Sequence, residues 1–308
     1  MESPRLCYPC HALQPLMDLS LVLVNYRHRV ALAACFDSLP AACAGLQYEV
    51  IVVDNASGDG LIADYALNRP DVRTIANATN EGFARGVNRG LEIAKGRCVA
   101  LLNPDTIAFP EAFTRMVRFV DAHPKVGLVG PKVTDPDGGI QYSCRRFPTH
   151  WAGLFNRYSL LTRMFPNNRF TRSYLMLDFD HESTLDVDWL TGACLVARRD
   201  AVDRVGPLDP EFFLFNEDVD WSKRMHAAGY RVVYLPEAHV MHVIGASKGP
   251  LPLWLIWRRH IGMMHYYHKH HPGPWYRTML TDVGILARCA HQFVINPLRA
   301  LTKGRPIK

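Results

Sequence analysis

The stretch Arg97–Thr106, RCVALLNPDT, decides the fold. Cys98–Leu102 is a short apolar run that follows a helical pattern, so it predicts a buried strand. Pro104 cannot donate to a β-ladder and disfavours helix at Asn103, which predicts that the sheet ends here. Asp105 is then held just past the carboxyl end of a central strand, where open α/β sheets bind their ligands. Taken alone, the stretch favours a polar turn in which Asp105 caps the next helix, and the rest of the chain argues against that simpler interpretation.

Strands and helices alternate through the N-terminal half of the sequence. Runs of β-branched residues and leucine, too short for helices, predict buried strands at Leu19–Val24, Glu49–Val53, Val72–Ala76, Cys98–Leu102 and Val126–Val129. The segments between them predict helices at Val30–Leu39, closed by Pro40, and at Phe83–Ala94 and Glu111–Ala122. This alternation indicates an α/β fold with a mixed, mainly parallel sheet flanked by helices.

The alternation stops after Pro131. Residues 134–183 are rich in Pro, Asn, Arg and aromatic residues and are interpreted as an insertion or lid. Strand character returns over Asp186–Ala197, and a helix that ends at Gly229 is predicted to begin after Asn216, a favourable N-cap residue. Two short strands are predicted to follow, Arg231–Leu235 and Ala238–Val243.

The pattern divides the chain into a loose N-terminal extension at 1–17, an α/β domain at 18–249 and a C-terminal helical region at 250–308. Met17 fits the natural start, because MDLSLVLVNY enters a strand at once. A wheel of residues 250–271 places Trp254, Trp257, Ile261, Met264 and Tyr267 on one side and Arg258, His265 and Lys269 on the other. This amphipathic pattern fits a helix at a membrane interface and equally a helix packed back on the domain, so both interpretations remain open.

The histidines of the C-terminal region are interpreted as a solvated or headgroup-facing surface: His260, His265, His268, His270 and His271. Residues 278–301 are apolar but are interrupted by charged residues, so no membrane-spanning helix is expected there.

The composition is typical of a globular protein, with 48% hydrophobic and 21% charged residues. The formal net charge of +6 suits an anionic substrate or membrane surface and is too small to indicate nucleic acid binding. Eight scattered cysteines indicate a reducing compartment, the cytoplasm. Cys7–His11 matches the haem-attachment pattern, but a motif of this length arises easily by chance. The spacing of Gly82, Gly86 and Gly90 is not that of the GxGxxG dinucleotide fingerprint.

Three acidic loops are predicted to meet at one edge of the sheet, carrying Asp54, Asp105, and the cluster of Glu217, Asp218 and Asp220. The chain contains, in this order, VLVNY, VVDNASGDG, NEGFARGVNRG, LLNPD, WLTGACLVARR, FFLFNEDVDWSKR and HVMHVIGAS. In order and spacing these motifs resemble glycosyltransferase family 2 over residues 18–270. Within the family, the resemblance is to the bacterial rhamnosyltransferase-like enzymes of cell-surface polysaccharide synthesis.

The resemblance implies a GT-A fold with a nucleotide-binding half, residues 18–131, and an acceptor and catalytic half, residues 132–249. It implies an inverting, metal-dependent transfer of a sugar, with rhamnose as the family-level expectation, from a dTDP- or UDP-sugar. The acceptor is expected to be a hydroxyl of a cell-surface glycan or of a lipid-linked molecule. The enzyme is expected to lie peripherally at the cytoplasmic face of the membrane, and a homo-oligomer is left open.

Two alternatives to this enzyme remain. One is a degenerate relative that binds glycans without catalysis, against which the intact acidic loops argue. The other is a sugar nucleotidyltransferase, but Asn25-Tyr26-Arg27-His28 stands where that class needs a glycine-rich phosphate loop.

The resemblance also assigns roles on the donor side. Asp54 lies in the base-binding loop, where an acceptor-only carboxylate suits the N–H between the two carbonyls of uracil or thymine. Asp105 matches the last Asp of the family's DxD motif, whose first position is Asn103 here, and His242 matches a downstream histidine that completes an Mg²⁺ or Mn²⁺ site. His239 is interpreted as structural. The other expected donor-side residues are Asn25, Asn80, Gly82, Asn88 and Arg224, the last at the diphosphate.

The acceptor hydroxyl must lose a proton as it attacks, and a carboxylate is the simplest general base. Asp218 matches the Asp of the family's ED motif, with Glu217 beside it, so Asp218 is the expected base. A helix N-terminus lowers the pKa of a carboxyl group whereas burial raises it, and the sequence leaves this balance open. The residues expected around the acceptor are Trp189 and Gly192 at the sugar, and Arg145 or Arg146 at a phosphate.

Overall fold

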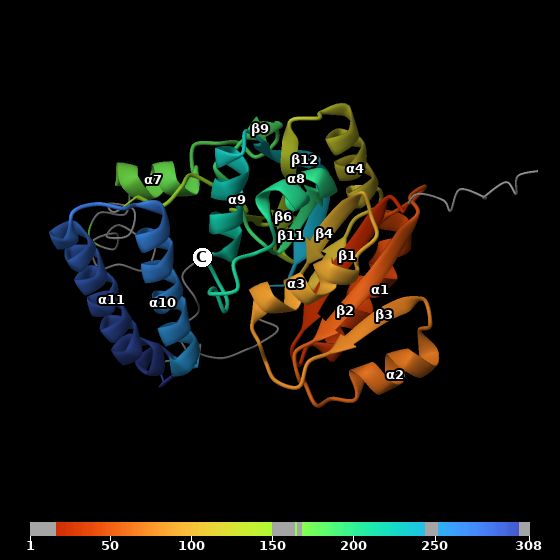
Figure 1. Ribbon diagram of the computed structural model, residues 1–308, viewed down its shortest axis with the longest axis horizontal. Coiled ribbons are helices and arrows are strands. Elements are labelled where there is room, and N and C mark those ends of the chain that lie inside the picture. Colours follow the sequence, from red (N-terminus) through yellow and green to blue (C-terminus); the bar gives the residue numbers. More distant parts are fainter. Residues whose placement is uncertain (1–16, 150–163, 165–167, 244–251, 302–308) are drawn as a thin grey trace, which may run out of the picture.

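The computed structural model describes residues 17–149, 164, 168–243 and 252–301. They form a layered structure in which helices cover both faces of one large sheet (Figure 1). The predicted N-terminal extension up to residue 16, the haem-like pattern at Cys7–His11 and much of the predicted insertion lie outside the described residues.

The sheet has the strand order β3-β2-β1-β4-β11-β6-β12-β5. One half consists of four parallel strands: β1 (Leu19–Asn25), β2 (Tyr48–Asp54), β3 (Val72–Ala76) and β4 (Cys98–Leu102). The other half contains β5 (Thr106–Ala108), β6 (Val126–Thr134), β11 (Cys194–Arg198) and β12 (Arg231–His242). Because β11 is antiparallel to both β4 and β6, and β6 is parallel to β12, the carboxyl ends of β4, β6 and β12 share one edge. The predicted mixed, mainly parallel sheet is confirmed.

Four further strands, each two residues long, follow β6 in the chain. The strands β7 (Ile140–Gln141) and β9 (Leu185–Asp186) pair with β6 and β12. The strands β8 (Cys144–Arg145) and β10 (Trp189–Leu190) form a separate antiparallel pair. Only β8 lies in the region predicted to be an insertion, whereas β10 lies in the segment predicted to regain strand character.

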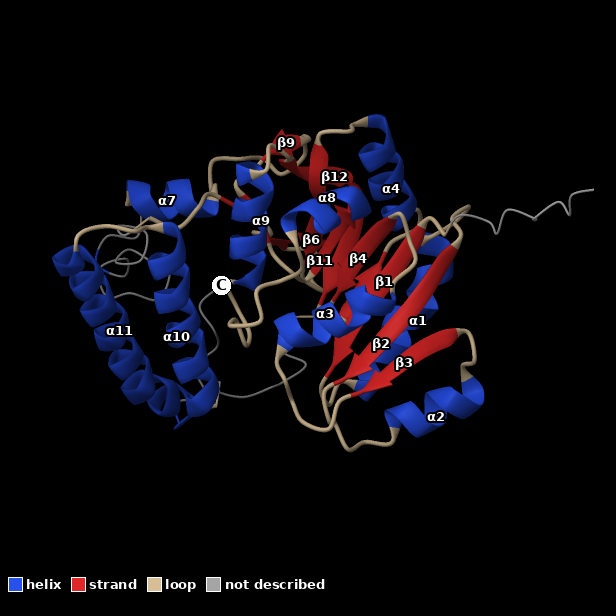
Figure 2. Ribbon diagram, in the orientation of Figure 1, coloured by secondary structure: helices blue, strands red, loops and turns tan. Residues whose placement is uncertain are grey.

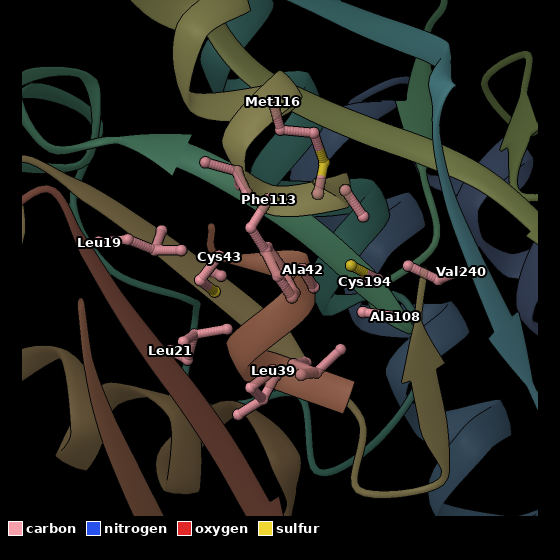
Figure 3. Close-up of a cluster of buried hydrophobic side chains, with 14 of the residues drawn as sticks. Leu19, Leu21, Leu39, Ala42, Cys43, Ala108, Phe113, Met116, Cys194 and Val240 are labelled. Atoms are coloured by element: carbon pink, nitrogen blue, oxygen red, sulfur yellow. The ribbon is translucent and has the colours of Figure 1, made fainter. Parts of the chain in front are cut away.

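Two hydrophobic cores lie on the two faces of the sheet. Leu21 and Leu23 of β1 enter one core, whereas Val22 and Val24 enter the other, which explains why this strand is a continuous apolar run. The first core is covered by α1 (Arg29–Ala42), α2 (Leu61–Asn68) and α4 (Ala112–Ala122). Figure 3 shows part of it, with Leu39, Phe113 and Met116 packed near β1 and β11. The second is covered by α3 (Phe83–Ile93), α8 (Arg199–Val205) and α9 (Glu217–Ala227) (Figure 2).

A helical hairpin of α10 (Leu253–His270) and α11 (Trp275–Leu301) lies beside α9 and the short helix α7 (Arg169–Leu175) (Figure 1). Buried Tyr266 and Tyr267 belong to the surface by which α10 contacts the domain. The same contact carries an ion pair from Lys269 and a hydrogen bond from His270 to the buried carboxylate of Asp220, at 2.8 and 2.7 Å. No helix in the described parts of the chain has the length and apolar character needed to cross a bilayer.

The structure corrects three predicted elements. Pro40 does not close the first helix, which continues to Ala42, because a proline in the last turn loses only one hydrogen bond and Cys43 still donates to Leu39. The two short strands predicted after residue 230 are one strand, β12, with an irregularity between Leu235 and His239. The single strand predicted at Asp186–Ala197 is divided into three, because Trp189 and Leu190 pair with β8 instead of the main sheet.

The structure also corrects the predicted surface of α10. Tyr267 is buried and its hydroxyl donates to the carbonyl of Thr149 at 3.0 Å, so it does not share the exposed side of Trp254 and Trp257. His260 is fully buried, with Nδ1 2.7 Å from the carbonyl of Ile256. The histidines therefore do not form one solvated surface, because α10 turns one of its faces to the domain.

Candidate active site

Predicted donor-side residues meet at the carboxyl edge of the parallel strands. Asn25 and Asp54 are register partners at the ends of β1 and β2. The side chain of Asn25 donates to Oδ1 of Asp54 at 2.8 Å and to the hydroxyl of Ser57 at 3.0 Å. Ser57, which the sequence analysis missed, also binds Asp54 through its hydroxyl and, at 3.1 Å, its N–H. The carboxylate of Asp54 is therefore held in one orientation at the end of the sheet.

Gly82 joins this edge to the loop before α9. Its N–H donates to Oδ1 of Asn80 at 3.0 Å, and the N–H of Phe83 donates to the carbonyl of Phe213 at 2.7 Å. The φ angle of Gly82 is +88°, and a Cβ there would lie 2.3 Å from the carbonyl oxygen of Phe213. This close approach of two backbone segments requires glycine.

The Gly82→Ala substitution is expected to destabilise the fold by more than about 3 kcal/mol, because backbone strain and a clash with a backbone oxygen add together. Gly45→Ala is the matched control, since Gly45 has a φ of +79° with no atom within 4 Å of the added Cβ. The control should cost only about 1–2 kcal/mol from backbone strain. Urea unfolding measures both, and equal losses would show that the contact with Phe213 is unimportant.

Two residues expected on the donor side lie elsewhere. The side chain of Asn88 donates to the carbonyl of Leu208 at 2.7 Å and accepts from its N–H at 3.0 Å, so it fastens α3 to the 206–211 loop. Arg224 pairs with Asp220 at 2.8 Å and donates to the carbonyls of Val205 and Pro207. Its hydrogen-bonding groups are used within the protein, so the expectation that Arg224 reaches the diphosphate is corrected.

Asp105 and His242 meet at the same edge. Oδ1 of Asp105 lies 3.2 Å from Nε2 of His242, and Nδ2 of Asn103 lies 3.5 Å from the same nitrogen. Pairing of β12 with β5 brings them together, because His242 stands opposite Thr106. His239, on the same strand, contacts the hydroxyl of Thr134 at 2.9 Å and stacks on a phenylalanine ring, as suits a structural histidine.

Gln141 fixes the orientation of the His242 ring. Its amide nitrogen donates to Oδ1 of Asp135 at 2.8 Å and to the carbonyl of His242 at 2.6 Å, which turns its amide oxygen toward Nδ1 of His242 at 3.0 Å. An amide oxygen can only accept, so Nδ1 carries the proton of this hydrogen bond, and Nε2 is the ring nitrogen that faces Asp105. Gln141 could not be recognised from the sequence, because it lies in a strand of only two residues.

The pair Asp105 and His242 fits a divalent cation. A carboxylate oxygen and an imidazole nitrogen that face one another are ligands that Mg²⁺ or Mn²⁺ accepts, and a hydrogen bond to the second ring nitrogen is typical of metal-binding histidines. Within the described residues, no group of three or more His, Cys, Asp or Glu side chains is placed to hold a metal. A cation here would therefore take further ligands from a substrate or from water.

Asp218 lies in the first turn of α9, next to its first residue Glu217, and faces Gly192. The N–H of Gly192 donates to Oδ2 of Asp218 at 3.0 Å. Burial raises the pKa of Asp218, against the opposing effects of hydrogen bonds from the N–H groups of Gly192 and Val219 and of the charge of Arg145. The sequence left open whether the helix N-terminus or burial dominates the pKa of Asp218. Burial dominates, so this carboxylate is more basic than that of an exposed aspartate.

The two acidic neighbours of Asp218 have different environments. Glu217 is only 5% exposed, and burial together with the charge of Asp218 raises its pKa. Asp220 is fully buried and pairs with Arg224, Lys269 and His270. Asp220 therefore has a structural role, as the anchor of α10.

Asn216 precedes this helix as predicted, but its side chain does not cap it. The residue has a φ of +73°, and its amide nitrogen is buried without a hydrogen-bond partner among the described residues.

Trp189 and Arg145, which were expected at the acceptor, lie against one another, and the charge of Arg145 acts on Asp218. The indole N–H of Trp189 donates to the carbonyl of Arg146 at 2.8 Å, and the guanidinium of Arg145 lies 5.1 Å from the Trp189 ring centroid. Arg146 instead pairs with Asp188 at 3.2 Å. The sequence could not separate these two arginines, whereas the structure places only Arg145 beside the candidate base.

A family model described as glycosyltransferase like family 2 matches residues 15–261. The chain belongs to this family. An N-acetylglucosaminyl-diphospho-decaprenol L-rhamnosyltransferase of Mycobacterium tuberculosis is 31% identical over 81% of this chain and 84% of its own length. The amylovoran biosynthesis glycosyltransferase AmsE of Erwinia amylovora is 24% identical over 70% of this chain and 71% of its own.

Solved glycosyltransferases share the fold of this family 2 chain. A mannosyltransferase of Pyrobaculum calidifontis, solved with GDP-Man and Mn²⁺, superimposes with a TM-score of 0.55. It is 17% identical, and the match covers 94% of this chain and 76% of that one. The GT-A fold and the assignment as a glycosyltransferase are thereby confirmed.

Proposed function

We propose that this glycosyltransferase moves a sugar, with inversion, from a dTDP- or UDP-sugar to a hydroxyl of a lipid-linked or cell-surface glycan acceptor. The proposal rests on one observation: Asp54, the Asp105–His242 pair and Asp218 meet at one edge of the sheet, on a family 2 scaffold. Rhamnose is the proposed sugar, because a relative of this chain is named an L-rhamnosyltransferase.

The donor is proposed to lie along the edge from β2 to β12. Asp54, fixed by Asn25 and Ser57, would accept the N–H of a uracil or thymine base. Asp105 and His242 would hold a divalent cation, which would neutralise the charge of the departing nucleoside diphosphate. We assign residues 18–131 to donor binding and residues 132–249 to the acceptor and catalysis.

Asp218 is proposed as the general base. Its carboxylate would take the proton of the acceptor hydroxyl as that oxygen attacks the anomeric carbon. The hydrogen bond from Gly192 holds Oδ2, which leaves the carboxylate in a fixed position for this transfer. Glu217 beside it favours its neutral form, because burial and the charge of Asp218 raise its pKa.

A panel of dTDP-, UDP- and GDP-sugars, assayed for nucleoside diphosphate release with a prenyl-diphosphate-linked N-acetylglucosamine acceptor, tests this function. We expect release from a dTDP- or UDP-sugar that depends on both the acceptor and Mg²⁺ or Mn²⁺. Release from a GDP-sugar alone would contradict the role of Asp54, and an unchanged rate in EDTA would contradict the role of the cation.

The helical hairpin is proposed to bind the cytoplasmic face of a membrane. Large apolar residues of α11 are exposed at spacings of three and four, which places them on one side of the helix: Tyr276, Met279, Leu280, Val283 and Leu286. Trp275, at the start of α11, is 75% exposed, and Trp254 and Trp257 of α10 are also exposed. Exposed Arg258 and Arg277 add the positive charge that anionic headgroups attract.

The chain is expected to sediment with anionic vesicles more strongly than with neutral ones, since each basic residue near an anionic surface contributes about 1 kcal/mol. Leu280→Ser with Val283→Ser should reduce the bound fraction severalfold. Leu67→Ser is the control, because Leu67 is 82% exposed on α2, outside the hairpin. Recovery of the unchanged protein in the supernatant with both vesicle types would contradict membrane binding.

A further inference from the structure

Arg145 is a cation beside the candidate base without a carboxylate partner among the described residues. Its Nε donates to the carbonyl of Tyr142 at 3.0 Å, and its guanidinium lies over the ring of Trp189. The positive charge of Arg145 lowers the pKa of Asp218, against the larger effect of burial. The adjacent Arg146 is neutralised by Asp188. Arg145 thus keeps a positive charge available to an anion from outside the protein.

Lys223 is a second cation of this kind, on α9 five residues after Asp218. Its ammonium lies 5.3 Å from the ring centroid of Phe147 and 5.5 Å from that of Tyr266. No carboxylate in the described part of the chain lies within ion-pair distance of it, whereas the neighbouring Arg224 is paired with Asp220. Burial lowers the pKa of Lys223, and Asp188, which favours its charge, is already bound by Arg146.

The two cations border the same part of the molecule. Phe147, beneath Lys223, is two residues from Arg145. Tyr174 of α7 contacts Arg145 at 6.0 Å from the ring centroid and accepts the N–H of Arg146 at its carbonyl. Aromatic rings thus surround both charges. A cation kept partly out of water without a partner raises the free energy of the protein, and an arriving anion would remove that cost.

We propose that Arg145 and Lys223 bind the phosphate groups of the acceptor, a sugar carried on a diphosphate, and so place its hydroxyl at Asp218. This inference rests on the proposed function, and it names the chemical class of the acceptor. A guanidinium can bind a phosphate through two parallel hydrogen bonds, and an ammonium adds a point charge for the second phosphate.

Two acceptors of the same sugar test the proposal: N-acetylglucosamine on a short prenyl diphosphate, and octyl N-acetylglucosaminide, which has no phosphate. The readout is the ratio of kcat/KM for the two acceptors at saturating donor. Lys223→Met is expected to lower this ratio about 10- to 100-fold, the range for a lost charge-assisted hydrogen bond. Arg145→Gln should do the same, and Arg145→Lys should recover part of the loss.

Arg172→Gln is the matched control, because Arg172 lies on α7 but is paired with Asp178. It should leave the ratio at the wild-type value. A ratio unchanged in both Lys223→Met and Arg145→Gln, or an equal fall in the control, would overturn the proposal.

A binding measurement separates this inference from the proposed function. Calorimetric titration of the full chain with the prenyl-diphosphate acceptor needs no turnover. Wild-type binding that weakens about tenfold or more in Lys223→Met supports the phosphate site even if no donor is transferred. Equal affinity in wild type and variant would overturn it even if transfer occurs.

Discussion

Asp218→Asn is expected to lower kcat by about 10²–10⁴-fold, because the amide keeps the shape of the carboxylate but cannot take a proton. The KM for the donor should hardly change, since Asp54 and the Asp105–His242 pair are proposed to bind it. Burial raises the pKa of Asp218, so this carboxylate takes up a proton at a higher pH than an ordinary aspartate does. As the pH is lowered, the activity of the wild-type enzyme should therefore fall before the pH reaches the usual pKa range of aspartate. Steady-state kinetics with varied donor and varied pH measure both effects.

Glu217→Gln is the matched control for this substitution. The pKa of Glu217 is raised, so its carboxyl group favours the neutral form, which glutamine imitates. Successive helical residues also point about 100° apart, so Glu217 and Asp218 cannot serve the same hydroxyl in the same way. An inactive Glu217→Gln beside an active Asp218→Asn would reverse the assignment. Asp220 does not offer a substitute base, because Arg224, Lys269 and His270 already bind its carboxylate.

Asp105→Ala is expected to abolish metal-dependent turnover while leaving the fold intact. Asp105 is the one carboxylate of the Asn103-Pro104-Asp105 loop, and its side chain is 15% exposed at the sheet edge, so its loss removes charge without opening the core. Activity with varied Mn²⁺, together with circular dichroism of the folded protein, measures the two outcomes separately.

His242→Ala and Gln141→Leu are expected to weaken the binding of Mn²⁺ at the same site by smaller amounts. The first removes a neutral ligand and should weaken the affinity for Mn²⁺ less than the loss of Asp105 does. The second leaves the ligand but frees its ring, and the expected loss of affinity is about 10–100-fold. Electron paramagnetic resonance of Mn²⁺ reports this binding without turnover. Full activity of Asp105→Ala in excess EDTA would contradict the metal assignment.

The parallel half of the fold could be predicted because each of its strands is a continuous apolar run that ends at a polar loop. Cys98–Leu102 and Val72–Ala76 have the predicted bounds. The second half was harder, because β11 is antiparallel and its neighbours β8 and β10 are two residues long. Such short pairs are set by tertiary contacts, which leave no periodicity in the sequence.

The residues of the candidate site could be predicted where a sequence motif requires one residue type at one position. The sequence motifs pointed to Asp54, Asp105, His242 and Asp218, and the structure brings these to one edge. Arg224 and Asn88 were misplaced, because a long polar side chain near a site can equally bind a carbonyl of a neighbouring loop. Lys223 could not be recognised from the sequence, because what distinguishes it is that no carboxylate of the described residues lies within ion-pair distance of its ammonium.

Transfer of a sugar to an acceptor hydroxyl by a site that includes Asp105 and Asp218 can be observed on the acceptor itself. The most direct test of this transfer is mass spectrometry of the prenyl-diphosphate-linked N-acetylglucosamine acceptor after incubation with the enzyme, Mn²⁺ and dTDP-rhamnose or other dTDP- and UDP-sugars. We expect the acceptor to gain the mass of one sugar, and this gain to disappear in Asp218→Asn and in Asp105→Ala. An acceptor of unchanged mass with every donor, or an undiminished gain in both variants, would contradict the account.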